Sequence, residues 1–262
     1  MSDPKARGRF VWFDLNTSDP DAAVTFYTDV VGWGTSKWQD APPGMPPYTM
    51  WQNGDDMIGG VGQLDPNMAS AGVPPHWVGY IGTPDVDATV AQAEKLGATV
   101  VVPPMDIPTV GRFSFMNDPQ GAMFGAFTAD TAAPGHEGEP RLGEFSWHEL
   151  ATTDCEGAFN FYSALFGWEK GDAMDMGPAG TYQLYTRNGQ QLGGMYNKTD
   201  DMPGPPSWNY YAMVNDLDGA VEKIKAGGGT VMVGPMEVPG GDHIVMGMDP
   251  QGAAFALHSR KQ

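Results

Sequence analysis

The chain has 262 residues, of which 41% are hydrophobic and 18% are charged, so it is long enough for two globular domains with buried cores. Its 32 Asp and Glu residues outnumber 14 Lys and Arg residues, and a formal net charge of -18 repels phosphate backbones and anionic membrane surfaces. We therefore expect no nucleic-acid and no membrane partner. The single Cys excludes an intramolecular disulfide framework, and the N-terminus has no apolar signal core, so we expect a cytoplasmic protein.

The first structural pattern begins with an alternating, aromatic strand at Phe10–Leu15. Asp19 can cap a following helix that has Pro20 at its first position and an apolar stripe with spacing i, i+3, i+4. Gly32 provides the stop signal of this helix. Two or three short strands are expected next, around Tyr48–Gln52 and Met57–Leu64.

The same pattern then starts again within the first half of the chain. His76–Ile81 is predicted to be a strand, and Asp85 caps a helix that ends at Gly97. Three strands are expected after it, near Thr99–Val102, Phe113–Asn117 and Met123–Phe127. The last two are joined by Asp118–Gly121, whose Pro at the second position and Gly at the fourth are typical of a type I turn.

The two halves of the sequence are copies of each other. FVWFDLNTSDPDAAVTFYTDVVGW, at 10–33, matches FSWHELATTDCEGAFNFYSALFGW, at 145–168, and NDPQGAMF later matches MDPQGAAF. A Pro-, Gly- and Ala-rich stretch without periodicity separates the copies. We therefore expect one domain at 1–130 and another at 142–262, joined by a linker at 131–141.

These patterns predict an α+β fold class: a tandem repeat of two domains, each built from two paired βαβββ units that form a cupped mixed sheet around a pocket. A strand, a capped helix with Phe-Tyr, a Gly-Trp pair and a closing Asp-Pro-x-Gly hairpin resemble the vicinal-oxygen-chelate (glyoxalase/bleomycin-resistance/dioxygenase) superfamily, and in particular its tandem two-domain glyoxalase-like proteins. The resemblance runs from Arg9 to His258. It implies the fold more strongly than the reaction, because the superfamily includes metal-dependent isomerases, lyases and dioxygenases as well as metal-free antibiotic-binding proteins.

The resemblance also implies where a metal would be held. Metal-using members take His, Glu or Gln ligands from the first and last strands of their paired units. The matching positions here are Phe13, Val78 and Gly125 in the first domain and His148, Asn209 and Ala256 in the second. Glu149 is expected on the opposite strand face from His148. Because His148 alone suits a metal ligand, we expect no complete metal site and no resident cofactor, while a divalent metal stays open.

His148 is the candidate catalytic residue, as a general base or as a hydrogen-bond partner of a ligand. The alternative is a half-buried His that bonds a backbone carbonyl. Further side chains are expected to line the pockets or their mouths, and with His148 the candidate ligand-binding residues are Phe13, Tyr48, Trp51, His148, Tyr182, Tyr185, Asn209 and His243. Aromatic and Met side chains of this kind adapt to apolar ligands, although large aromatics also build cores.

The resulting hypothesis is a protein that binds a small hydrophobic or aromatic molecule without a complete metal site, in drug resistance or sequestration. Two alternatives stay open. The first is a metal-dependent enzyme, either a lyase similar to lactoylglutathione lyase or a dioxygenase or hydroxylase. The second is a non-catalytic interaction protein. A tandem chain can satisfy internally the pairing that single-domain relatives achieve by dimerising, so both a monomer and a homodimer are compatible with the sequence.

Overall fold

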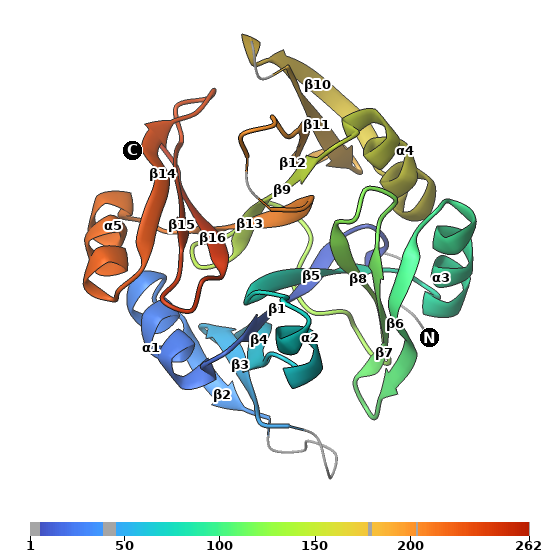
Figure 1. Ribbon diagram of the computed structural model, residues 1–262, viewed down its shortest axis with the longest axis horizontal. Helices are drawn as coiled ribbons and strands as arrows, with labels where there is room; N and C mark the ends of the chain where they lie inside the picture. The colour runs from blue at the N-terminus through green and yellow to red at the C-terminus, as the bar shows by residue number, and fades with distance from the viewer. Residues whose placement is uncertain (1–5, 39–45, 178–179, 203, 262) are drawn as a thin grey trace. The chain divides into compact units, whose positions relative to one another are not determined.

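The computed structural model describes residues 6–38, 46–177, 180–202 and 204–261 (Figure 1). In the first half of the chain the elements are β1 (Phe10–Thr17), α1 (Pro20–Val30), β2 (Gly34–Lys37), β3 (Tyr48–Asn53), β4 (Asp56–Gln63), α2 (Pro66–Ser70), β5 (His76–Gly82), α3 (Val86–Lys95), β6 (Thr99–Ile107), β7 (Gly111–Asn117) and β8 (Met123–Ala129). No helix in the described part of the chain is both long and apolar enough to cross a membrane.

The second half repeats this order, and its described residues contain no counterpart of α2. Its elements are β9 (Phe145–Thr152), α4 (Cys155–Phe166), β10 (Glu169–Asp175), β11 (Thr181–Arg187), β12 (Gln190–Asn197), β13 (Ser207–Met213), α5 (Leu217–Ala226), β14 (Thr230–Glu237), β15 (His243–Met248) and β16 (Ala254–Ser259).

The strands form two eight-stranded mixed sheets with the same topology. Their orders are β2-β3-β4-β1-β5-β8-β7-β6 and β10-β11-β12-β9-β13-β16-β15-β14. In each sheet, the first strand of every βαβββ pattern pairs in parallel with the last strand of the same pattern. The hairpin strands pair antiparallel. The predicted α+β tandem repeat is therefore confirmed. The short elements β2 and α2 were not predicted, because β2 is polar and largely exposed and α2 has five residues and no buried side chain.

Local sequence explains where the four longer helices begin. An Asp precedes each of them and accepts a hydrogen bond from a backbone N–H in the first turn, as Asp19 does from Ala22 and Asp154 from Gly157. The turn after β7 also forms as predicted, since the Gly121 N–H donates to the Asp118 carbonyl at 2.9 Å.

Residue contacts divide the chain into two compact units that do not follow the two halves of the sequence. Unit 1 consists of Met1–Trp12, Val78–Pro134 and Trp147–Trp208, and unit 2 of Phe13–Trp77, Gly135–Ser146 and Asn209–Gln262. Each unit therefore combines one βαβββ pattern from the first half with one from the second. Within unit 1, α3 packs beside α4, and within unit 2, α1 packs beside α5 (Figure 1).

Candidate functional site

Strand β9 presents two different faces, because successive side chains of a strand point to opposite sides of the sheet. The His148 ring stacks on Phe10, with ring centroids 4.2 Å apart and an interplanar angle of 7°. Phe10 in turn contacts Trp168, which packs against the Tyr162 ring of α4. His148 therefore lies on the face that α4 covers. Glu149 projects from the opposite face, which we call the open face because α4 lies on the other side of the sheet.

His148 lies in an apolar, aromatic environment. Its side chain is 7% exposed, and its Nδ1 is 2.9 Å from the carbonyl oxygen of Leu192. Burial lowers the pKa of His148 to about 4. The imidazole is therefore neutral at neutral pH, and its Nδ1–H donates to the carbonyl. The catalytic role assigned to His148 from the sequence stays a prediction, and this environment matches the alternative of a core His bonded to backbone.

On the open face of β9, a buried carboxylate is joined to aromatic side chains. Tyr182 Oη donates to Glu149 Oε2 at 2.8 Å, and Trp147 Nε1 donates to Tyr182 Oη at 2.8 Å. Tyr196 stacks on Tyr182 with ring centroids 5.9 Å apart. Burial, followed by the negative charge of Glu149, raises the pKa of both Tyr182 and Tyr196. Both phenols therefore keep their protons, and Tyr182 acts as a hydrogen-bond donor to the carboxylate.

Two adjacent glycines in β12 allow this arrangement. A Cβ atom at Gly194 would lie 1.9 Å from Tyr182 Cε1, and one at Gly193 would lie 1.7 Å from the His148 carbonyl oxygen. Any other residue at Gly194 would collide with the Tyr182 ring where it crosses the strand. Gly194 is thus the backbone feature that lets the Tyr182 hydroxyl reach Glu149, while Gly193 makes room for the backbone of β9.

The first half of the sequence contains the same device, and there it lies in unit 2. Tyr48 Oη donates to Asp14 Oδ1 at 2.6 Å. A Cβ atom at Gly60 would lie 2.0 Å from Tyr48 Oη, and one at Gly59 would lie 2.1 Å from the Phe13 carbonyl oxygen. We call these two arrangements, Glu149 with Tyr182 and Asp14 with Tyr48, the carboxylate–tyrosine pairs.

The remaining predicted ligand-binding residues are not gathered at one place. Phe13, Trp51 and Tyr185 are each less than a tenth exposed and belong to the aromatic cores. Asn209 is half-buried on β13, and His243 is exposed at the start of β15. Of the eight residues predicted from the sequence, only two tyrosines belong to the carboxylate–tyrosine pairs. The ligand-binding roles predicted for all eight remain predictions from the sequence.

Sequence reasoning missed four residues of these arrangements: Trp147, Glu149, Tyr196 and Asp14. A signal for two of them was present in the repeat. Each half contains a tyrosine on one hairpin strand, a Gly-Gly pair on the next, and an acidic residue on the first strand of the unit. Because a Gly inside a strand indicates close approach of another group, the paired glycines could have pointed to the tyrosine ring and its partner.

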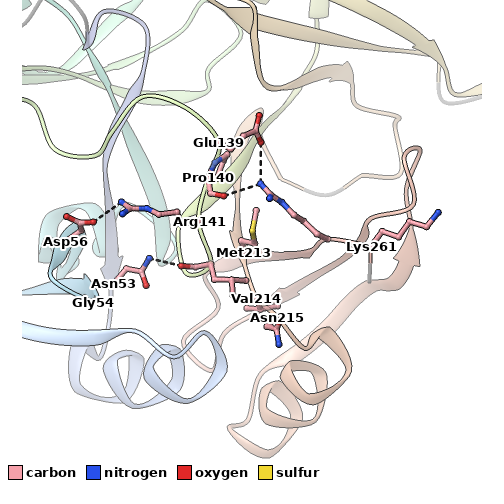
Figure 2. Close-up of a pocket in the computed structure, with 12 residues that line it drawn as sticks. Asn53, Gly54, Asp56, Glu139, Pro140, Arg141, Met213, Val214, Asn215 and Lys261 are labelled. Carbon is pink, nitrogen blue, oxygen red and sulfur yellow. Dashed lines mark hydrogen bonds and ion pairs between the residues drawn. The ribbon is translucent and has the colours of Figure 1, made fainter.

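Unit 2 also contains a cavity of about 830 Å³, which the end of the linker, the β3–β4 turn, the end of β13 and the C-terminal segment surround (Figure 2). Two of its arginines pair with carboxylates of the same lining. Arg141 donates to Asp56 at 2.8 Å, and Arg260 approaches Glu139 at 3.3 Å. Asn53 Nδ2 donates to the Leu142 carbonyl at 2.7 Å. These bonds hold the end of the linker in place. The carboxylate–tyrosine pairs do not line this cavity.

The residues present do not fit a protein-bound metal of the kind that the resemblance implies. Nowhere in residues 6–38, 46–177, 180–202 and 204–261 do three or more His, Cys, Asp or Glu side chains gather as such a site requires. At Gly125, where the resemblance places a carboxylate ligand, a Cβ atom would lie 2.9 Å from the Tyr80 ring and 3.1 Å from the Phe115 ring. Two aromatic rings thus occupy the space of the expected ligand.

Comparisons with known proteins agree with this architecture. The sequence model of the Glyoxalase/Bleomycin resistance protein/Dioxygenase superfamily matches residues 9–125 and 144–257. A Mycobacterium bovis protein named "Putative glyoxylase CFP32" is 33% identical over 250 residues, which cover 94% of this chain and 92% of that protein. "Anthracycline biosynthesis protein DauV" of Streptomyces sp. (strain C5) is 29% identical over 262 residues, covering 96% of this chain and 93% of that protein. The Mn(II)-bound glyoxalase from Novosphingobium aromaticivorans has the same fold, with a TM-score of 0.64 at 17% identity over 100% of this chain and 84% of that chain.

Proposed function

Because the chain belongs to the Glyoxalase/Bleomycin resistance protein/Dioxygenase superfamily, we propose that it binds a small aromatic molecule on the open strand faces that carry the carboxylate–tyrosine pairs. The observation that supports this most directly is the repetition of the pair in both halves of the chain. In each copy a glycine is required where the tyrosine ring crosses the strand. A ring held over a strand in this way is a preformed wall for a ligand.

The aromatic side chains of unit 1 suit a planar ligand. Trp147, Tyr182 and Tyr196 are half-buried and lie around a carboxylate. Aromatic rings attract other rings in offset-stacked or edge-to-face arrangements, which adds about 0.5–1.5 kcal/mol to the burial of apolar area. Tyr182 is held by its bonds to Trp147 and Glu149, so its ring needs little ordering when a ligand binds.

The names of related proteins support the same ligand class. One similar protein is named for anthracycline biosynthesis, and anthracyclines are planar polycyclic aromatic compounds. Proteins with the same fold include a 2,2',3-trihydroxybiphenyl 1,2-dioxygenase, whose name describes an aromatic compound. We therefore choose an anthracycline as the first probe.

The test is an isothermal titration of the chain with an anthracycline, repeated on variants of the open face. Trp147→Ala should weaken binding about tenfold or more, which corresponds to the loss of roughly 1.4 kcal/mol of ring contact. Tyr48→Ala, in the pair of the first half, reports whether the open face in unit 2 binds as well. Cys155→Ala, at the start of α4, is the matched control and should leave the affinity unchanged. Absence of binding of every planar aromatic probe, or equal affinity of the Trp147 variant, would contradict the proposal.

A second candidate function is a metal-dependent enzyme of the lyase or dioxygenase type. It is favoured by the relative named as a glyoxylase and by the likeness to an Mn(II)-bound glyoxalase. Metal analysis of protein purified without chelator, followed by native mass spectrometry with added Mn²⁺, separates the two functions. Binding of aromatic ligand with no stoichiometric metal supports the first. One tightly bound metal per chain that is lost in Glu149→Gln supports the second.

A further inference from the structure

We propose that the two halves of the sequence are mutual binding partners, each docking the tyrosine of its first helix on the Asp-Pro-Gln-Gly turn of the other, so that they stay folded together when the linker is cut. This inference does not depend on the proposed function. It starts from the composition of the two units, each of which contains residues from both halves.

In unit 1 the docking contact joins α4 of the second half to the β7–β8 turn of the first. Tyr162 Oη donates to Asp118 Oδ2 at 3.0 Å, and Trp208 Nε1 donates to Tyr162 Oη at 3.0 Å. The other oxygen of Asp118 accepts the backbone N–H groups of Gln120 and Ala122. Asp118 is 3% exposed, so this carboxyl is buried under the helix of the other half.

Unit 2 contains the same contact with the roles of the halves exchanged. Here Tyr27, on α1 of the first half, donates to Asp249 Oδ2 of the second half at 3.1 Å, and Trp77 Nε1 donates to Tyr27 Oη at 3.0 Å. The other oxygen of Asp249 accepts two backbone N–H groups of its own turn. Phe26 and Tyr27 also pack edge-on against Phe255 of β16.

A second pair of contacts repeats this exchange. Trp33 of the first half donates its indole N–H to the Gly143 carbonyl of the second half at 2.6 Å. Trp168 of the second half donates to the Gly8 carbonyl of the first half at 2.7 Å. Both indoles are at most 2% exposed. Since buried polar groups are costly when their partners are removed, separating the halves would expose apolar rings and leave these carbonyls and carboxyls short of donors.

The consequence is that the core of each unit is built from side chains of both halves. The first helix of each half packs on its own sheet and also against the last strand of the other half, as Tyr162 does against Phe124 in unit 1 and Tyr27 against Phe255 in unit 2. The linker then serves to raise the local concentration of one half near the other, while the reciprocal contacts supply the binding energy.

The test inserts a specific protease site between Pro134 and Gly135, at the boundary between the units, in the otherwise intact chain. After cleavage, the two fragments should elute together from a size-exclusion column at the volume of the uncut protein. The denaturation midpoint of the cut protein should fall over a roughly hundredfold dilution, because its unfolding now includes dissociation, whereas that of the uncut protein should not change.

Variants of the docking contact sharpen this test. Tyr27→Phe combined with Tyr162→Phe should raise the dissociation constant of the cut halves about tenfold or more, since two buried carboxyls each lose a donor. Thr25→Ala, on the exposed side of α1, is the matched control and should leave the dissociation constant unchanged. Elution of the cut protein as two separate folded fragments, or its aggregation on cleavage, would overturn the proposal.

A second measurement uses the uncut chain. In native-state hydrogen exchange, Asp249→Asn in the second half should speed exchange of the amides of α1 in the first half, because the substitution weakens their shared contact. Unchanged exchange in α1 would show that the halves open independently and would overturn the proposal in the same way.

Discussion

The two carboxylate–tyrosine pairs use one backbone device with different side chains. In unit 1 the carboxylate is Glu149, 9% exposed, and its tyrosine also receives an indole N–H from Trp147. In unit 2 the shorter Asp14 is half-buried and is bound by Tyr48 at 2.6 Å. The position of the ring over a glycine is common to both copies, while the acid and its neighbours differ.

This difference shows which part of the duplicated device is constrained. A tyrosine can lie across a strand only if the residue below it lacks a side chain. The glycine and the tyrosine ring therefore occur together in both copies. The acid can differ in length, because both an Asp and a Glu side chain reach the tyrosine hydroxyl. We therefore expect the two open faces to hold ligands of the same class with different affinities.

The largest effect is expected at His148, which stands where the first half has Phe13. Its folded pKa of about 4 lies below the ordinary value of 6.5, so between these values the unfolded chain binds a proton that the folded chain does not. The free energy of unfolding should therefore fall as the pH drops from 6.5 to 4, by about 3 kcal/mol in total from this group. Urea denaturation across this pH range measures the slope.

His148→Phe, which copies the first half, should remove this part of the pH dependence. Comparison with the wild type is needed because burial raises the pKa of Asp118 and Asp249, which favours the folded state as the pH falls and so acts in the opposite direction. Equal slopes in the variant and the wild type would show that His148 is solvated in the folded chain.

The next largest effect is expected from filling the space under the tyrosine rings. Gly194→Ala and Gly60→Ala should each cost roughly 1–3 kcal/mol of folding free energy, because the added methyl overlaps Tyr182 or Tyr48. Gly62→Ala is the matched control in the same strand as Gly60, since its Cβ would meet the Tyr48 ring at an ordinary 3.6 Å. Thermal denaturation compares all three variants. Equal losses at Gly60 and Gly62 would mean that the ring is not held over β4.

A smaller loss of stability is expected when the hydroxyl group of Tyr182 or Tyr48 is removed. Tyr182→Phe removes the donor to a buried carboxylate and the acceptor of the Trp147 N–H, so we expect a loss of about 2 kcal/mol. Tyr48→Phe should cost about 1 kcal/mol, because Asp14 is closer to solvent and can be hydrated. Chemical denaturation of the two variants gives the comparison, and a larger loss at Tyr48 would reverse our ranking of the two pairs.

The smallest effect is expected at Cys155, whose equivalent in the first half is Pro20. Cys155→Ala should change stability by about 0.5 kcal/mol or less, since the thiol makes one weak bond, to the Met195 carbonyl at 3.3 Å. Burial raises the pKa of the Cys155 thiol, so its thiolate fraction at neutral pH is low. Reaction with a thiol reagent should be slower in the folded chain than in denaturant, and fast labelling of the folded chain would contradict this.

Much of the architecture could be predicted from the sequence because its determinants are local. An Asp that caps a helix, a Pro at the first helical position and the turn at Asp118–Gly121 act over a few residues, and the repeat showed that each signal occurs twice. The polar strand β2 was not predicted because its residues do not alternate between apolar and polar. The helix α2 was too short for a helical spacing of apolar residues to be recognised.

Two features were decided by the tertiary structure alone. An alternating strand such as β9 has two faces, and only the packing of α4 determines that His148 is covered while Glu149 lies opposite, beside Tyr182. Likewise, each half carries the same Tyr-bearing helix and the same Asp-Pro-Gln-Gly turn, so the sequence cannot tell whether a helix docks on its own turn or on that of the other half. Long-range contacts in the folded chain make that choice, because they alone bring Tyr162 to Asp118 and Tyr27 to Asp249.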